Sequence, residues 1–169
     1  MEFWDIYDSN KQKTGRTMKK NDWILKDGEY HLTVLGVIMR PDGKFLITQR
    51  VMTKSWAPGW WEVSGGAAMA GEDSIDAVKR EVLEETGLDV ILDQTFRETV
   101  TYSPKRDTQK VVVYFLALAR NYDYVPQEEE IADIRWVDIV HATRLLTYEN
   151  DKTIVNKARA AIKLNNHSM

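Results

Sequence analysis

The sequence contains no cysteine. Its absence excludes disulfide bonds, thiolate metal ligands and a cysteine nucleophile, and it agrees with a reducing compartment. Histidine is also scarce, and His31, His141 and His167 lack the close spacing that two ligands on one element would need. A metal site in this protein therefore has to be built from oxygen ligands.

Long apolar runs and a strong net charge are absent as well. No segment approaches the ~20 apolar residues of a membrane helix, and the polar N-terminus has no apolar signal core. The 169 residues carry a net charge of −3, with 43% hydrophobic and 29% charged side chains, so no basic excess indicates binding to nucleic acid. We expect one soluble, cytoplasmic domain that binds neither a membrane nor a nucleic-acid polymer.

Strand and helix patterns mix along the chain without strict alternation. Residues 3–8 and 16–18 predict a hairpin within an N-terminal extension of about 30 residues, and strands at 32–39 and 45–49 predict another around the turn at Pro41-Asp42-Gly43. Further strands are expected at 62–64, 90–92, 96–102, 111–118 and 134–137, and helices at 139–146 and 150–164. This order favours an α+β fold, or a mixed sheet with helices on both faces.

The most informative segment runs from Gly65 to Leu88 and contains a predicted amphipathic helix. Glu81, Glu84 and Glu85 share one face of that helix. Their charges repel one another, and the last two lie near the C-terminus, where negative charge is unfavourable. A solvated acidic face would explain an isolated cluster of this kind. A Mg²⁺ ion, which prefers oxygen ligands shared with substrate phosphates, would explain it better.

This segment resembles the motif of the Nudix hydrolase family. Gly66 is followed after five residues by Glu72, and after seven more by the sequence Arg-Glu-Val-Leu-Glu-Glu-Thr-Gly-Leu of residues 80–88. Every defined position of the Nudix box matches, which is far more specific than an isolated ExxEE. The resemblance implies a Nudix-type α/β/α sandwich around a mixed β-sheet over roughly residues 30–165, as a single Nudix domain within residues 1–169.

The resemblance also implies roles for the residues of the motif. Glu84 and Glu85 are expected to bind Mg²⁺ or Mn²⁺, with Glu81 as a further ligand or as the base that activates water. The Gly65 carbonyl is expected to contribute, and Arg80 to orient the glutamates. Glu130 corresponds to a position that supplies an extra carboxylate in many relatives. Which carboxylate is the general base stays open.

Substrate contacts are expected to lie mainly in the loops. An aromatic ring near the expected pocket could stack on a nucleobase, and a cation could contact phosphates. The aromatic candidates are Trp56, Trp60, Trp61 and Tyr102, and the cationic candidates are Arg50, Lys54, Lys105 and Arg106. For most of them packing or simple solvation is the competing interpretation.

Three functions follow from the resemblance. The first is a pyrophosphohydrolase that cleaves the diphosphate bond of a nucleotide sugar, a dinucleotide or a nucleoside triphosphate. The second is a nucleotide-binding regulatory module without turnover, which the intact carboxylates disfavour. The third is suggested by the N-terminal residues, which resemble the isopentenyl diphosphate isomerase-like subset, but that isomerase needs a cysteine. We also expect a homodimer, from the prevalence of twofold symmetry and from the family.

Overall fold

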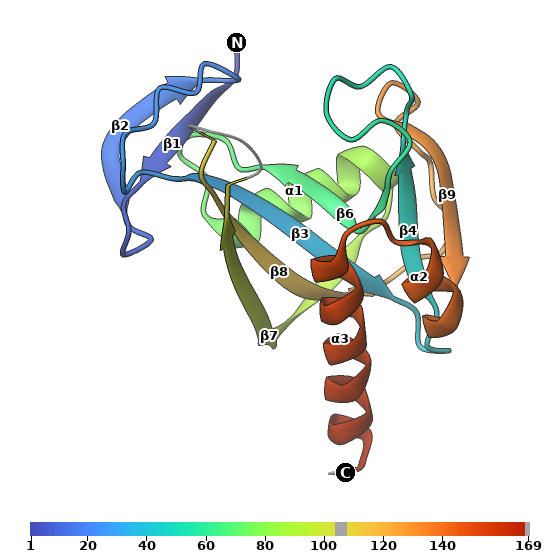
Figure 1. The fold of residues 1–169 in the computed structure, drawn as a ribbon. Helices are drawn as coiled ribbons and strands as arrows, with labels where there is room; N and C mark the ends of the chain where they lie inside the picture. The colour runs from blue at the N-terminus through green and yellow to red at the C-terminus, as the bar shows by residue number, and fades with distance from the viewer. Residues whose placement is uncertain (104–107, 168–169) are drawn as a thin grey trace.

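The N-terminal hairpin is a separate two-stranded sheet at one end of the protein (Figure 1). A computed structural model describes residues 1–103 and 108–167. Strands β1 (Phe3–Tyr7) and β2 (Lys13–Lys19) pair antiparallel, as predicted. The hairpin has a small core of its own, formed by Trp4, Ile6, Met18 and Leu25. A bridge between Tyr7 and Tyr30 joins it to the main sheet.

A mixed seven-stranded sheet forms the centre of the fold. Its strands are β3 (His31–Met39), β4 (Phe45–Arg50), β5 (Trp61–Glu62), β6 (Ser64–Ala67), β7 (Val90–Tyr102), β8 (Lys110–Ala119) and β9 (Ile131–Val137). The order is β5-β4-β3-β8-β7, with β6 paired to β3 and β9 paired to β4. Strands β3 and β8 are parallel and the other pairs are antiparallel, so the predicted mixed sheet is confirmed.

Two strand predictions were wrong in detail. The hairpin expected over 32–49 is paired only next to its turn, where Met39 lies opposite Phe45. Beyond that pair the two strands separate, because β4 pairs with β9 and β3 pairs with β6. The separate strands expected at 90–92 and 96–102 form one strand, β7, with a register shift between Asp93 and Arg97. A bulge of this kind adds residues to one strand without ending the pairing.

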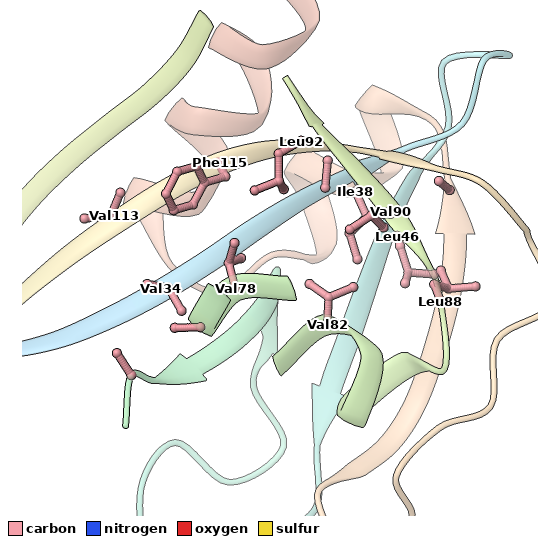
Figure 2. Packing of buried hydrophobic residues seen from close by; sticks show 14 of the residues in the cluster. Val34, Ile38, Leu46, Val78, Val82, Leu88, Val90, Leu92, Val113 and Phe115 are labelled. Carbon is pink, nitrogen blue, oxygen red and sulfur yellow. The ribbon is translucent and has the colours of Figure 1, made fainter. Parts of the chain in front are cut away.

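Helix α1 (Ser74–Thr86) covers one face of the sheet. Its N-cap is Asp73, which accepts a hydrogen bond from the Asp76 N–H, and Gly87 closes the helix in the left-handed conformation at φ 71°. Val78 and Val82 pack against β3 and β8 in a core that Figure 2 shows between helix and sheet. The amphipathic helix predicted within residues 65–88 is therefore present, with a cap at each end.

The opposite face is covered by α2 (Ile139–Leu145) and α3 (Glu149–His167). Ile154, Val155 and Ala158 of α3 are buried against the sheet, as the helical spacing predicted. The layers are helix, sheet and helices, which confirms the α/β/α sandwich (Figure 1). No helix in the described part of the chain is long and apolar enough to cross a membrane.

Candidate active site

Two glycines bring strand β6 into direct contact with the acidic face of α1. The Gly65 N–H donates a hydrogen bond to Glu85 Oε2 at 3.3 Å. A Cβ atom at Gly66 would lie 2.7 Å from Glu81 Oε2, so only a residue without a side chain leaves room for this carboxylate. A Cβ at Gly65 would lie 2.0 Å from the Val34 carbonyl oxygen. The paired glycines therefore allow Glu81 and Glu85 to lie against the backbone.

Arg80 connects the carboxylates of the motif. Its guanidinium donates to both oxygens of Glu72, with Nε at 2.7 Å and Nη2 at 2.9 Å. Nη1 reaches Glu81 at 3.0 Å and Glu84 at 3.2 Å, and Nη2 also reaches the Ala67 carbonyl at 3.1 Å. A planar guanidinium can hold such a set in fixed geometry, whereas a lysine cannot. Arg80 thus makes the contacts that would be needed to orient the glutamates, as the resemblance implied.

Burial and like charge make the ionised site unfavourable. Burial raises the pKa of Glu85 well above its ordinary value, and the charges of Glu62, Glu81 and Glu130 raise it further. Burial also raises the pKa of Glu81, partly offset by Arg80. Burial raises the pKa of Glu62 to about 7, although its ion pair with Arg50 opposes the shift. The carboxylates of the site therefore carry more negative charge than the neighbouring arginines neutralise.

The predicted metal ligands are arranged unequally. Glu81 and Glu85 lie at the paired glycines, whereas Glu84 is half exposed and ion-paired to Arg80. Among residues 1–103 and 108–167, no three His, Cys, Asp or Glu side chains are close enough to form a metal-binding group. The donor set itself consists of carboxylates and backbone, which are the ligands of Mg²⁺. Side-chain rearrangement, with release of Glu84 from Arg80, would be needed to bring all three glutamates onto one ion.

Glu130 lies directly before β9 in the chain. Its carboxylate forms an ion pair with Lys54, and its carbonyl accepts a hydrogen bond from the Val51 N–H. Its charge is among those that raise the pKa of Glu85, so its carboxylate acts on the same site.

A cleft of about 780 Å³ opens beside the paired glycines. Arg50, Lys54 and Trp56 of the predicted substrate residues line it, and Trp60 and Trp61 do not. Trp60 packs edge-on against Tyr148, and the Trp61 ring lies under the Arg135 guanidinium at 5.1 Å. Tyr102 is the last residue of β7. Lys105 and Arg106 lie outside the described residues.

The cleft also contains residues that the sequence prediction missed. Asp151 is buried and accepts hydrogen bonds from the Tyr114 hydroxyl at 2.6 Å and the Val63 N–H at 3.3 Å. Burial raises the pKa of Asp151 to about 6. A signal was present, because Asp151 precedes Ile154, Val155 and Ala158 at helical spacing on the apolar face of α3. An acidic residue on such a face indicates a buried polar contact.

Comparison with known proteins decides the family. The NUDIX domain profile matches residues 29–157, which is most of the chain. The protein belongs to the Nudix hydrolase family. The α1 carboxylates, Arg80 and the paired glycines of this Nudix hydrolase are therefore the residues of its family motif, and the chain is a pyrophosphohydrolase by membership.

Its relatives differ in their recorded activities. An uncharacterized Nudix hydrolase of Listeria monocytogenes is 34% identical over 140 residues, covering 81% of this chain and 80% of that protein. The nucleoside triphosphatase NudI of Escherichia coli is 31% identical over 121 residues, covering 64% and 85%. The Caenorhabditis elegans Ap4A hydrolase structure superposes with a TM-score of 0.69 at 25% identity, covering 79% and 98%. These relatives leave the substrate of this Nudix hydrolase open.

A further solved structure extends the likeness to the N-terminus. A Deinococcus radiodurans protein superposes with a TM-score of 0.69, covering 93% of this chain and 99% of that one. Its identity is 17%, so the likeness concerns the fold alone. It covers a larger share of the chain than the family profile, which begins at residue 29.

Proposed function

We propose that this Nudix hydrolase cleaves the diphosphate bond of a nucleoside diphosphate derivative with a divalent cation, Mg²⁺ or Mn²⁺, as cofactor. The observation that supports the proposal most directly is the pair Glu81 and Glu85, held against Gly65 and Gly66 beside the cleft. Their excess negative charge favours a cation, and the cleft is large enough for a nucleotide. Relatives that act on nucleoside triphosphates and on Ap4A support the nucleotide class.

Each residue of the site has a specific task in this proposal. Glu81, Glu84 and Glu85 would hold the cation, with the Gly65 carbonyl as a further ligand. The bound cation supplies neutralisation of the diphosphate charge. Arg80 keeps the glutamates in place, and Arg50 and Lys54, at the rim, contact the phosphates when substrate displaces their carboxylate partners. Glu130 or one of the α1 glutamates accepts the proton of the attacking water.

Product analysis with a substrate panel tests the proposal. The purified protein is incubated with Mg²⁺ and with nucleotide sugars, dinucleotides and nucleoside triphosphates, and products are separated by chromatography. We expect a nucleoside monophosphate and a second phosphorylated product from at least one member. Tight binding of one member without turnover of any would instead favour the regulatory module.

A further inference from the structure

The N-terminal segment forms one wall of the cleft. The family profile begins at residue 29, yet the residues before it contribute Trp4, Lys20, Asn21 and Trp23 to the lining. The hairpin core of Trp4, Ile6, Met18 and Leu25 holds this segment in place. The cleft is thus completed by a part of the chain that lies outside the matched domain.

Trp23 is held there in an unusual backbone conformation. Its φ is 48° and that of Asn21 is 67°, in the left-handed region that bulky residues rarely adopt. Its ring packs edge-on against Trp4 and His31, with centroids 5.5 and 5.6 Å away. His31 is 2% exposed, and its Nδ1 has no hydrogen-bond partner among residues 1–103 and 108–167. Such backbone strain is commonly retained where a side chain has to be presented to a ligand.

Lys110 lies between Trp23 and a second indole from another element. Its Nζ is 5.7 Å from the Trp23 centroid and 5.8 Å from that of Trp56, which belongs to the β4–β5 loop. Both distances are within the range of cation–π attraction. The ammonium thus lies over both indole rings, so a planar ligand that stacks on either ring has to displace it, and the displaced ammonium remains a hydrogen-bond donor in the same region of the cleft.

The distance between this region and the paired glycines matches the length of an extended nucleotide. On β3, His31 pairs with Lys110 and Leu35 pairs with Gly65. Four residues of extended strand separate the two positions by about 13 Å. Thr33, Leu35 and Val112 line the cleft between them. An extended nucleotide, with its base at one end and its phosphates at the other, fits this separation.

We propose that Trp23 and Trp56 stack on the nucleobase of the substrate and that Lys110 donates a hydrogen bond to an acceptor on its edge. The inference rests on the proposed function, because it assumes that the phosphates lie at Gly65 and Arg50. It assigns base recognition to the N-terminal segment together with the β4–β5 loop.

A comparison of ligands with and without a base tests this assignment without turnover. Dissociation constants of the four common nucleoside 5′-monophosphates and of ribose 5-phosphate are measured by ligand-observed NMR titration in chelator-treated buffer. We expect at least one monophosphate to bind about fivefold or more tightly than ribose 5-phosphate, as base stacking predicts. Trp23→Ala and Lys110→Met should bring this ratio close to one.

Matched variants separate recognition from general damage. Trp23→Phe retains an aromatic face and should keep most of the ratio. Ile24→Ala, at the exposed neighbouring position, and Lys44→Met, in the β3–β4 turn, should leave the ratio unchanged. Equal wild-type affinity for ribose 5-phosphate and every monophosphate, or an unchanged ratio in Trp23→Ala, would overturn the assignment. Either result could occur while the enzyme still hydrolyses a nucleotide, so the proposed function is judged separately.

Discussion

At the residue scale, Arg80 has the largest number of polar contacts in the motif. It holds Glu72 through two hydrogen bonds and reaches both Glu81 and Glu84. These contacts keep three carboxylates in place, and they lower the pKa of Glu72, so it stays ionised. We therefore propose that Arg80 positions the groups that act on the substrate.

Arg80→Lys should lower kcat/KM by about 10- to 100-fold, as is usual when a residue that orients metal ligands is changed. The charge is retained, but a single ammonium cannot make the same forked contacts. Arg120→Lys, in the exposed ion pair with Asp89, is the control and should behave like the wild type. Steady-state kinetics on the best substrate provides the measurement. Wild-type kinetics in Arg80→Lys would contradict the positioning role.

The buried carboxylate of Asp151 gives a prediction with a defined pH dependence. Its pKa is raised by burial to about 6, above the ordinary value near 3.9, so stability contributed by the protonated form is lost as pH rises through this window. Tyr114→Phe removes a donor to this carboxylate. We expect a loss of about 1–3 kcal/mol that is larger at pH 8 than at pH 5.

Urea denaturation of Tyr114→Phe at the two pH values measures this difference. Tyr122→Phe is the control, because Tyr122 is exposed and lies away from the cleft residues. A loss that is the same at both pH values would show that the Tyr114 hydroxyl does not stabilise the ionised form of Asp151.

At the element scale, local chemistry determines α1 and long-range pairing determines the sheet. Asp73, the apolar stripe and Gly87 are all local signals, and the helix itself could be predicted from sequence. The divergence of β4 from β3 depends on β6 and β9, which are distant in sequence. The cleft was missed for the same reason, since Trp23 and Lys110 meet only after β3 and β8 pair.

Gly66 on β6 and Gly36 on β3 both face α1, and they give a prediction about the contact between this helix and the sheet. A Cβ at Gly66 would meet the Glu81 carboxylate, whereas a Cβ at Gly36 would meet Val82 Cγ2 at 3.1 Å. Gly66→Ala should therefore lower kcat with little loss of stability, because a flexible side chain can move aside. Gly36→Ala should lower stability with a smaller effect on kcat, because it disturbs core packing. Thermal melts and kinetics on both variants check this contrast, and the reverse pattern would contradict the placement of Glu81.

At the scale of the whole molecule, the sandwich places an acidic helix and an aromatic cleft on either side of β6. The motif predicted the acidic helix, together with the family. The aromatic cleft is assembled from the hairpin, the β4–β5 loop, β8 and α3. No local pattern in these segments marks them as neighbours, so substrate recognition could not be predicted from sequence to the same depth.

Cation binding should stabilise the molecule as a whole, because the folded state gathers carboxylates that the unfolded chain separates. A ligand at 100 times its Kd adds about 2.7 kcal/mol when it binds only the folded state. Mg²⁺ should therefore raise the unfolding midpoint of the wild type and raise it less in Glu81→Gln. Melting curves with increasing Mg²⁺ provide the test, with Asp89→Asn, at an exposed carboxylate that does not line the cleft, as the control. An equal shift in Glu81→Gln would place the cation elsewhere.

The central claim is that the partly buried carboxylates at the paired glycines, Glu81 and Glu85, carry out diphosphate hydrolysis. Mg²⁺-dependent turnover of the best nucleotide substrate by Glu85→Gln tests it most directly. The amide oxygen can still accept the Gly65 N–H, and the neutral side chain removes a buried charge, so the variant should fold at least as stably as the wild type without metal. We predict that kcat falls by about 100-fold or more. Wild-type turnover by the folded variant would contradict the account.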